Sequence, residues 1–169
     1  TQASEGGSLA SWRGIVVTSG GHLSAENATI ADAVTAIEVG SGASADLKSL
    51  LLHNSTNGLN NSGSTTITAS GCENIQNGCI TNHGTLSADT ITTTDSGQLA
   101  LNTGDATFTD IEGIDVGVLI DSADGASGSF MDVEANGVGL VLRAHGDQSA
   151  TTFTAFGITD ADLLIDASG

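Results

Sequence analysis

The chain contains no proline and no tyrosine among its 169 residues, and only three lysine and arginine residues stand against 20 acidic ones. Turns without proline depend on glycine and asparagine, which tolerate positive φ angles. The net charge of −17 excludes nucleic acid and anionic membranes as partners, because both require basic patches on the protein. Such a charge suits a soluble extracellular protein.

Long apolar runs are missing as well. The run from Leu50 to Leu52 has three residues, whereas a membrane-spanning helix needs about 20. We therefore expect no membrane insertion. No basic region followed by an apolar segment opens the chain, so we expect a signal peptide to be absent or already removed.

A short pattern returns eight times along the chain: an apolar residue, any residue, an apolar residue, and then a polar turn rich in Gly, Ser, Asn and Asp. The second apolar position recurs every 19 to 23 residues. It is occupied by Val17, Val39, Asn61, Ile80, Leu101, Ile120, Leu142 and Ile165, and Asn61, with Gly78 at the first position, is an exception that is not apolar. A repeat of this length with strand-like alternation is typical of a solenoid.

A second apolar anchor follows in each repeat, flanked by residues that favour strands. These anchors are Ile30, Leu47, Ile67, Ile91, Phe108, Phe130 and Phe153. No stretch shows helical spacing, which excludes leucine-rich and helical repeats. The pattern predicts an all-β parallel β-helix of about eight coils of 19–23 residues, with three short strands per coil. We expect one domain over residues 1–169, as a segment or subunit with uncapped ends.

The segment from Trp12 to Leu23, continued by Asn27 to Ile30, resembles one coil of the right-handed parallel β-helix repeat proteins. The resemblance extends over residues 12–165. These proteins share the pectin-lyase-like fold and are common as secreted surface proteins and adhesins. Because the family includes lyases, hydrolases, adhesins and inert stalks, the resemblance implies a fold and leaves the function open.

Alternation along the first strand predicts which side chains face the core. The interior columns are expected to contain Ile15, Val17, Ile37, Val39, Leu140, Leu142, Leu163 and Ile165. Asn61 then also points inward, where its amide can bond to the backbone of neighbouring coils.

One charged column is informative. Arg143 follows Leu142, and the equivalent positions in the neighbouring coils are Asp121 and Asp166. This set could belong to a lyase-like or hydrolase-like site, but a structural ion ladder with an arginine between two carboxylates is the favoured interpretation. We expect no catalytic residue and no required cofactor.

Cys72 and Cys79 flank a six-residue turn. A disulfide is the preferred interpretation if the protein is exported, and two free buried thiols are the alternative. Carboxylates gather in turns at Asp105, Asp110, Glu112, Asp115, Asp132, Glu134, Asp160 and Asp162. Calcium binding there is a weak hypothesis, because no known calcium-loop spacing is present.

Two outward columns are rich in threonine. Their candidate members are Thr66, Thr68, Thr90, Thr92, Thr107, Thr109, Thr152 and Thr154. An ordered threonine array resembles the ice-binding faces of antifreeze solenoids. Strand propensity is the favoured explanation, since threonine pairs well with itself across strands.

The outward positions of the first strand in the later coils read Ala100, Leu119, Val141 and Leu164, which predicts an exposed apolar column and an assembly contact. The ends of the chain also complement each other in register. Leu163, Leu164 and Ile165 at one end, with Leu9 and Trp12 at the other, are therefore candidate contacts for head-to-tail stacking.

The sequence thus favours an extracellular or cell-surface β-solenoid that is structural or adhesive. Its expected partner is itself, end to end or laterally, or flanking coils of a longer chain; glycans are a further candidate. The alternatives are a carbohydrate-active enzyme that uses the Asp121–Arg143–Asp166 face and an ice-binding protein that uses the threonine columns.

Overall fold

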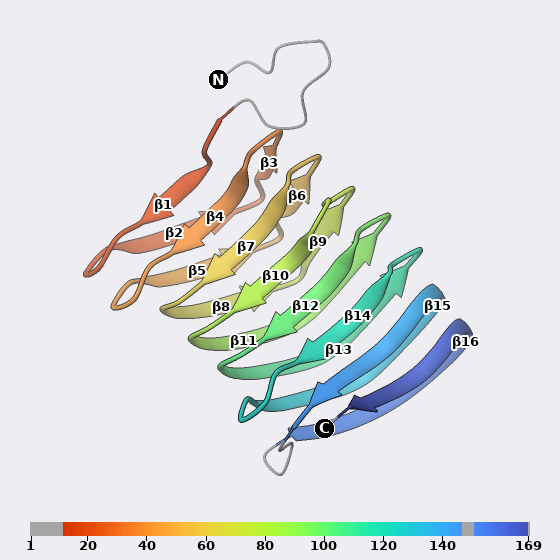
Figure 1. The fold of residues 1–169 in the computed structure, drawn as a ribbon. Coiled ribbons are helices and arrows are strands. Elements are labelled where there is room, and N and C mark those ends of the chain that lie inside the picture. The colour runs from red at the N-terminus through yellow and green to blue at the C-terminus, as the bar shows by residue number, and fades with distance from the viewer. Residues whose placement is uncertain (1–11, 147–150, 169) are drawn as a thin grey trace.

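The structure is a computed structural model that describes residues 12–146 and 151–168. Its described elements are sixteen β-strands, and each strand pairs in parallel with its counterpart in the adjacent coil. The chain winds through about seven turns, and successive coils stack into one elongated body (Figure 1). The predicted parallel β-helix is confirmed.

The first face of the solenoid carries the strand that the eightfold repeat predicts. Its strands follow one another in the order of the coils (Figure 1). They are β1 (Ile15–Val17), β4 (Thr35–Val39), β7 (Asn57–Asn61), β10 (Gly78–Asn82), β12 (Gln98–Asn102), β14 (Val118–Ser122) and the C-terminal parts of β15 (Ser127–His145) and β16 (Thr151–Ser168).

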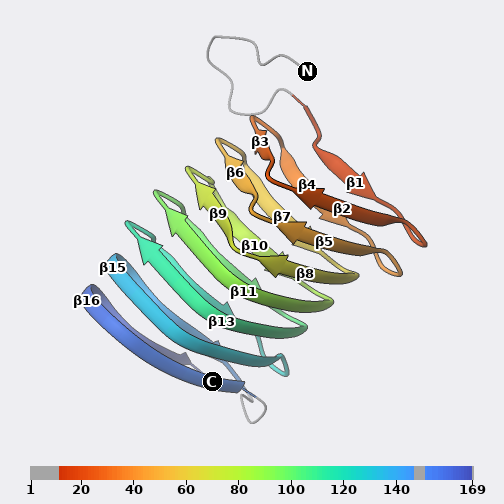
Figure 2. The ribbon, with the colours of Figure 1, turned by 180° about the vertical axis from the view of Figure 1, so that it is seen from behind.

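The second and third faces lie behind the first (Figure 2). The second face contains β2 (His22–Glu26), β5 (Ser44–Lys48), β8 (Ser64–Thr68) and the first halves of β11 (Thr85–Thr94) and β13 (Asp105–Ile114). The third face contains β3 (Thr29–Ala31), β6 (Leu51–His53), β9 (Ser70–Glu73) and the second halves of β11 and β13. Strands β15 and β16 run along all three faces.

Three separate strands per coil are therefore found only in the early coils. The corner between the second and third faces has a left-handed residue there, with φ of 52° at Asn27, 51° at Ser49 and 51° at Ala69. Thr90 and Asp110 occupy this corner in β11 and β13, within continuous strands. Neither residue has a positive φ, and β11 and β13 pass this corner without a break. Asp132, at the same corner in β15, again has a positive φ of 47°, although β15 continues through it.

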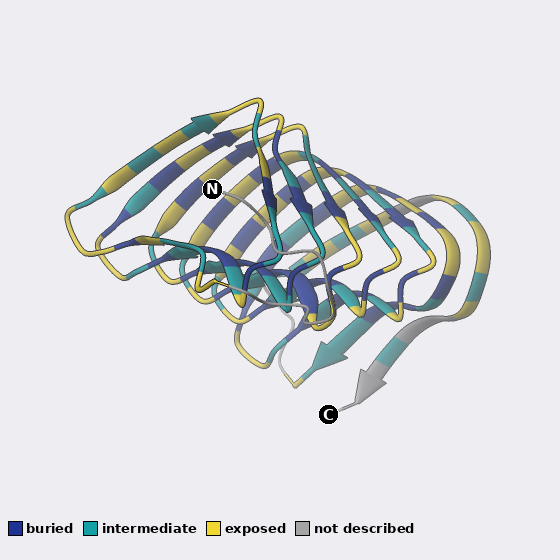
Figure 3. Ribbon diagram, turned by 90° about the horizontal axis from the view of Figure 1, so that it is seen from above, coloured by how far each residue is buried: buried dark blue, intermediate teal, exposed yellow. Residues whose placement is uncertain are grey.

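The core is a set of stacked columns that runs the length of the solenoid. Buried and exposed residues alternate along the strands (Figure 3), as the period of two requires. Ile37 and Val39 have no exposed surface, and Leu140 and Leu142 are buried. The side chains of Leu163 and Ile165 lie outside the described part of the structure. Phe108 and Phe130 stack with ring centroids 5.4 Å apart.

Alternation fails in the first-face strands β4, β7, β10, β12, β14 and β15, where two or three consecutive residues are buried. The pairing between β4 and β7 is interrupted at the same place, between Thr35 and Ile37, so the backbone bends and turns both side chains inward. The additional buried column contains Ala36, Gly58, Cys79, Leu99, Leu119 and Val141. The predicted outward column is therefore wrong: Leu119 and Val141 have no exposed surface, and Ala100 is 1% exposed.

The register of several anchors also differs from the predicted one. Ile80 pairs with Leu59, and Asn61 pairs with Asn82. Leu101 pairs with Thr81 and is half-buried on the outer side, so it is not a core anchor. Likewise Ile30 pairs with Leu52 and Ile91 with Ile111 on the third face, instead of joining the column of Leu47, Phe108 and Phe130. The lengths of the corners vary between coils, which hides these shifts of register.

The corrected register reveals an asparagine ladder inside the solenoid. The amide Nδ2 of Asn61 donates to Asn82 Oδ1 over 2.8 Å, and Asn82 Nδ2 donates to Asn102 Oδ1 over 2.9 Å. All three asparagines are buried. Asn61 also donates to the carbonyl of Thr85, one coil away. The expectation that Asn61 points inward and bonds to a neighbouring coil is confirmed.

The two cysteines form a disulfide that crosses the interior. Cys72 on the third face and Cys79 on the first face are bonded, with their Cα atoms 5.8 Å apart. Both residues are buried. The preferred prediction for this pair is confirmed, and the bond ties two faces of the solenoid together at the corner between β9 and β10.

Candidate functional site

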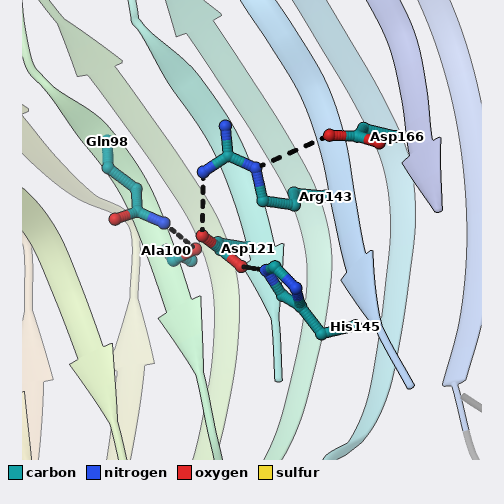
Figure 4. A network of polar contacts seen from close by, with 6 residues as sticks. All are labelled: Gln98, Ala100, Asp121, Arg143, His145 and Asp166. Atoms are coloured by element: carbon teal, nitrogen blue, oxygen red, sulfur yellow. Dashed lines mark hydrogen bonds and ion pairs between the residues drawn. The ribbon is translucent and has the colours of Figure 1, made fainter. Parts of the chain in front are cut away.

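The charged column on the first face forms as predicted. Asp121 of β14, Arg143 of β15 and Asp166 of β16 are direct neighbours in register. Arg143 Nη1 lies 3.4 Å from Asp121 Oδ2, and Arg143 Nε lies 4.0 Å from Asp166 Oδ2 (Figure 4). The guanidinium group thus lies between two carboxylates from adjacent coils, and the predicted ion ladder is confirmed.

A histidine that the sequence analysis did not assign joins this column. His145 Nε2 lies 3.0 Å from Asp121 Oδ1 (Figure 4). His145 follows Arg143 by two residues on the same strand, so both side chains leave β15 on the same side. The sequence contains a signal for this contact: His145 lies two residues after Arg143, which is aligned with Asp121 in the adjacent coil. Nearby, Gln98 Nε2 donates to the carbonyl of Ala100 over 3.2 Å.

Both carboxylate oxygens of Asp121 are occupied. Its side chain is 15% exposed, and it accepts from Arg143 through Oδ2 and faces His145 through Oδ1. A carboxylate that already contacts a guanidinium group and an imidazole ring is poorly placed to accept a proton from a substrate. The geometry therefore favours a ladder that joins coils, as expected for arginine and carboxylates in register.

The same arrangement recurs at the other basic side chains. Four of them contact a carboxylate in the adjacent coil, whereas His83 Nδ1 contacts the hydroxyl of Thr103. The pairs are Arg13–Glu38 at 3.1 Å, Lys48–Glu26 at 2.9 Å, His22–Asp46 at 3.6 Å and His53–Glu73 at 3.9 Å. The basic groups thus join coils, and the excess of carboxylates leaves a strongly negative surface.

Lys48 and Glu26 also shift each other's protonation. The hydrogen bond and the charge of Lys48 lower the pKa of Glu26, and the carboxylate of Glu26 raises the pKa of Lys48. Both groups are exposed to solvent, so this pair contributes little to stability.

The threonines do not form one continuous array. Thr66 and Thr107 belong to one exposed column, but Asp46, Ser87 and Ser129 belong to it as well. Thr90 and Thr92 pair with Asp110 and Glu112 on the third face. The predicted alignment of Thr-x-Thr units is therefore wrong across these coils. Thr152 pairs with Ser129 in the same column as Thr66, and Thr68, Thr109 and Thr154 are exposed.

The residues predicted to form the assembly contact differ in their burial, and some lie outside the described part of the structure. Leu119 and Val141 are buried in the core and cannot serve as contacts. Trp12 is 42% exposed; its indole Nε1 donates to the carbonyl of Ala31 over 2.8 Å. Leu9 lies outside the described residues, as do the side chains of Leu163, Leu164 and Ile165, although the backbone of these three belongs to β16.

Within residues 12–146 and 151–168, no group of three or more His, Cys, Asp or Glu side chains lies close enough together to hold a metal ion. Glu112 and Glu134 are neighbours in register, but two carboxylates fall short of the six to eight oxygen ligands that calcium prefers. The calcium hypothesis therefore stays a prediction without structural support.

Comparisons with protein-family models, with curated proteins and with solved structures find no match for this chain. In the described part of the chain, no helix is long and apolar enough to cross a membrane. Any functional conclusion therefore depends on the coils themselves.

Proposed function

We propose that this chain is a structural or adhesive unit of an extracellular β-solenoid, such as a stalk, surface fibre or filament, without a catalytic site of its own. The observation that carries the proposal is incomplete burial of the core at both end coils. The partly buried core residues are Ile15, Leu23, Ala25 and Ala28 in the first coil and Phe153, Ile158 and Ala161 in the last.

One coil further in, the equivalent side chains are buried. Ala45 is 1% exposed and Leu47 is 4% exposed, whereas their partners Leu23 and Ala25 are partly exposed. A further parallel coil stacked on β2 would cover Leu23 and Ala25 in the same way. Removing apolar surface from water contributes about 25 cal/mol per Å², so such stacking is favourable.

Backbone groups at the outer strands favour the same arrangement. Among the described strands, β1 pairs with β4 alone and β16 pairs with β15 alone. Strand edges of this kind recruit further strands. A coil of a longer chain and a second copy both supply a parallel strand. Contact between opposite ends of two copies is heterologous and propagates into a fibre unless rotation closes it.

Two further observations support an extracellular location and a role at surfaces. The disulfide between Cys72 and Cys79 is typical of oxidising compartments. The net charge of −17 keeps a protein soluble and repels anionic surfaces. Neutral glycans are a candidate partner for the adhesive role, because the outer faces expose hydroxyl and amide side chains between the carboxylates.

The test is the association state of the purified chain, measured by sedimentation velocity across a concentration series and by electron microscopy. We expect end-to-end species that grow with concentration. Leu23→Lys places a charge on the exposed end of the core and should suppress them. Ser24→Lys places the same charge on the outward side of the same strand and should leave them unchanged.

Both variants should retain the circular dichroism spectrum of a β-protein, since β2 is the outermost strand of the second face. A wild-type chain that stays monomeric at every concentration would contradict the proposal. Equal behaviour of the two variants would show that the end of the core is not the contact.

A further inference from the structure

The asparagines of this chain include three that begin the sequence Asn-x-Ser/Thr. They are Asn27-Ala28-Thr29, Asn54-Ser55-Thr56 and Asn60-Asn61-Ser62. This tripeptide is the acceptor for N-linked glycans on exported proteins, and modification requires that it lie in an accessible surface segment. The three tripeptides can therefore be compared by how accessible each is in the folded protein.

Asn27 lies at the corner between β2 and β3, in the left-handed conformation with φ of 52°. Its side chain is exposed, Thr29 is exposed, and Ala28 is half-buried. The backbone N–H of Asn27 donates to the carbonyl of Lys48 over 3.0 Å. The corner is thus held against the next coil. The exposed side chain of Asn27 also hydrogen-bonds to the carboxylate of Glu26 on the surface.

The neighbouring residue at this corner leaves space for a large substituent. Ser49 occupies the equivalent position in the next coil, with φ of 51° and an exposed side chain. Its small hydroxymethyl group does not cover Asn27. A glycan on Asn27 Nδ2 would therefore extend into solvent without disturbing a packed column.

The other two tripeptides are partly inside the protein. In Asn54-Ser55-Thr56, the middle residue Ser55 has no exposed surface. Its hydroxyl accepts from the N–H of Ala33 and donates to the carbonyl of His53, each over 3.1 Å. The Oδ1 of Asn54 accepts from Asn74 Nδ2 over 2.6 Å. This corner is therefore fixed by bonds within the fold.

Asn60-Asn61-Ser62 is still less accessible. Asn60 belongs to β7, and its Oδ1 is a buried atom. Asn61 is the first member of the internal ladder and has no exposed surface. An enzyme could reach this tripeptide only if the strand left the sheet.

We propose that Asn27 is an N-glycosylation site and that Asn54 and Asn60 are unmodified in the folded protein. The Nδ2 atom of Asn27 attacks the anomeric carbon of a lipid-linked glycosyl phosphate donor. A C–N bond forms, the C–O bond to the lipid phosphate breaks, the lipid phosphate leaves as an anion, and one Nδ2 proton is released. The inference rests on the extracellular location proposed above.

The test is peptide mass spectrometry on the chain purified from the cells that naturally produce it. We expect a sugar mass on the peptide with Asn27 and unmodified peptides for Asn54 and Asn60. Enzymatic removal of the glycan should convert Asn27 to aspartate. Two variants expressed in the same cells, Asn27→Asp and Thr29→Val, should lose the sugar, because each removes one required group of the tripeptide. Asn60→Asp should retain it.

Thiol labelling of the same sample after denaturation separates this inference from the proposed location. An unmodified Asn27 in a sample whose cysteines are disulfide-bonded overturns the glycosylation proposal and leaves export intact. An unmodified Asn27 with free thiols contradicts both. Glycans on Asn54 or Asn60 would show that accessibility in the fold does not select the site.

Discussion

The asparagine ladder offers the most direct test of what holds the coils together. Asn82 is 1% exposed and makes three hydrogen bonds of 3.0 Å or shorter: from Asn61, to Asn102 and to the carbonyl of Asp105. Replacing Asn82 with alanine removes all three bonds. Each buried hydrogen bond contributes about 1 kcal/mol, so Asn82→Ala should lower the free energy of unfolding by about 3 kcal/mol.

The chain supplies a matched control. Asn77 Nδ2 donates to Asn57 Oδ1 in the adjacent coil over 3.0 Å, so this bond also joins two asparagine side chains, but Asn77 is exposed. Water replaces a lost bond at this site, so Asn77→Ala should change the free energy of unfolding by less than about 0.5 kcal/mol. The two variants therefore compare the loss of three buried hydrogen bonds with the loss of one exposed bond.

Urea denaturation followed by circular dichroism measures both effects. Urea is preferable to guanidinium because it leaves the electrostatics of this acidic chain unscreened. Equal changes for Asn82→Ala and Asn77→Ala would refute the argument, since burial would then not determine the contribution of the ladder. The comparison requires that the slope of the denaturation curve stay constant between variants.

Three further outcomes are expected. Leu119→Lys should unfold the protein or lower the free energy of unfolding by more than about 3 kcal/mol, because it buries an unpaired charge. Leu101→Lys lies on the half-buried outer side of its strand and should fold. A higher melting temperature for Leu119→Lys than for Leu101→Lys would contradict the inward bend of the first-face backbone. Replacing both cysteines with alanine should lower the free energy of unfolding by about 2 kcal/mol, since the closed loop is short; an unchanged urea midpoint would show that the bond adds nothing. In an NMR titration, Lys48→Met should raise the pKa of Glu26. The stabilisation from Glu26 is present above its pKa in the unfolded chain and is lost as the pH falls through its lower folded pKa; an unchanged titration would exclude the ion pair in solution.

Several features of this protein are determined by local sequence. The recurrence of paired apolar residues every 19 to 23 positions is enough to predict a parallel solenoid, because a strand of period two that returns at that interval must stack on itself. The Asp121–Arg143–Asp166 column and the disulfide follow from spacing between adjacent coils or within one turn. Short sequence distances leave little room for error in register.

Register over many coils was decided only by tertiary structure. A shift of two residues keeps every side chain on the same side of the strand, so alternation cannot detect that Asn61 aligns with Asn82 rather than with Ile80. The glycine that follows two positions after Asn61, Asn82 and Asn102 marks the correct alignment, because each Oδ1 accepts from that glycine's N–H.

The bend in the first face is the other feature that the sequence alone did not reveal. Alternation assigns Leu119 and Val141 to the surface, but a local turn of the backbone places two successive side chains inside. The reason is physical. Alternation reports only the pleat of an undistorted strand, whereas the core of a closed coil must be filled from every side. Packing across the interior, with Leu119 against Gly113 of the opposite face, decides the direction of these side chains.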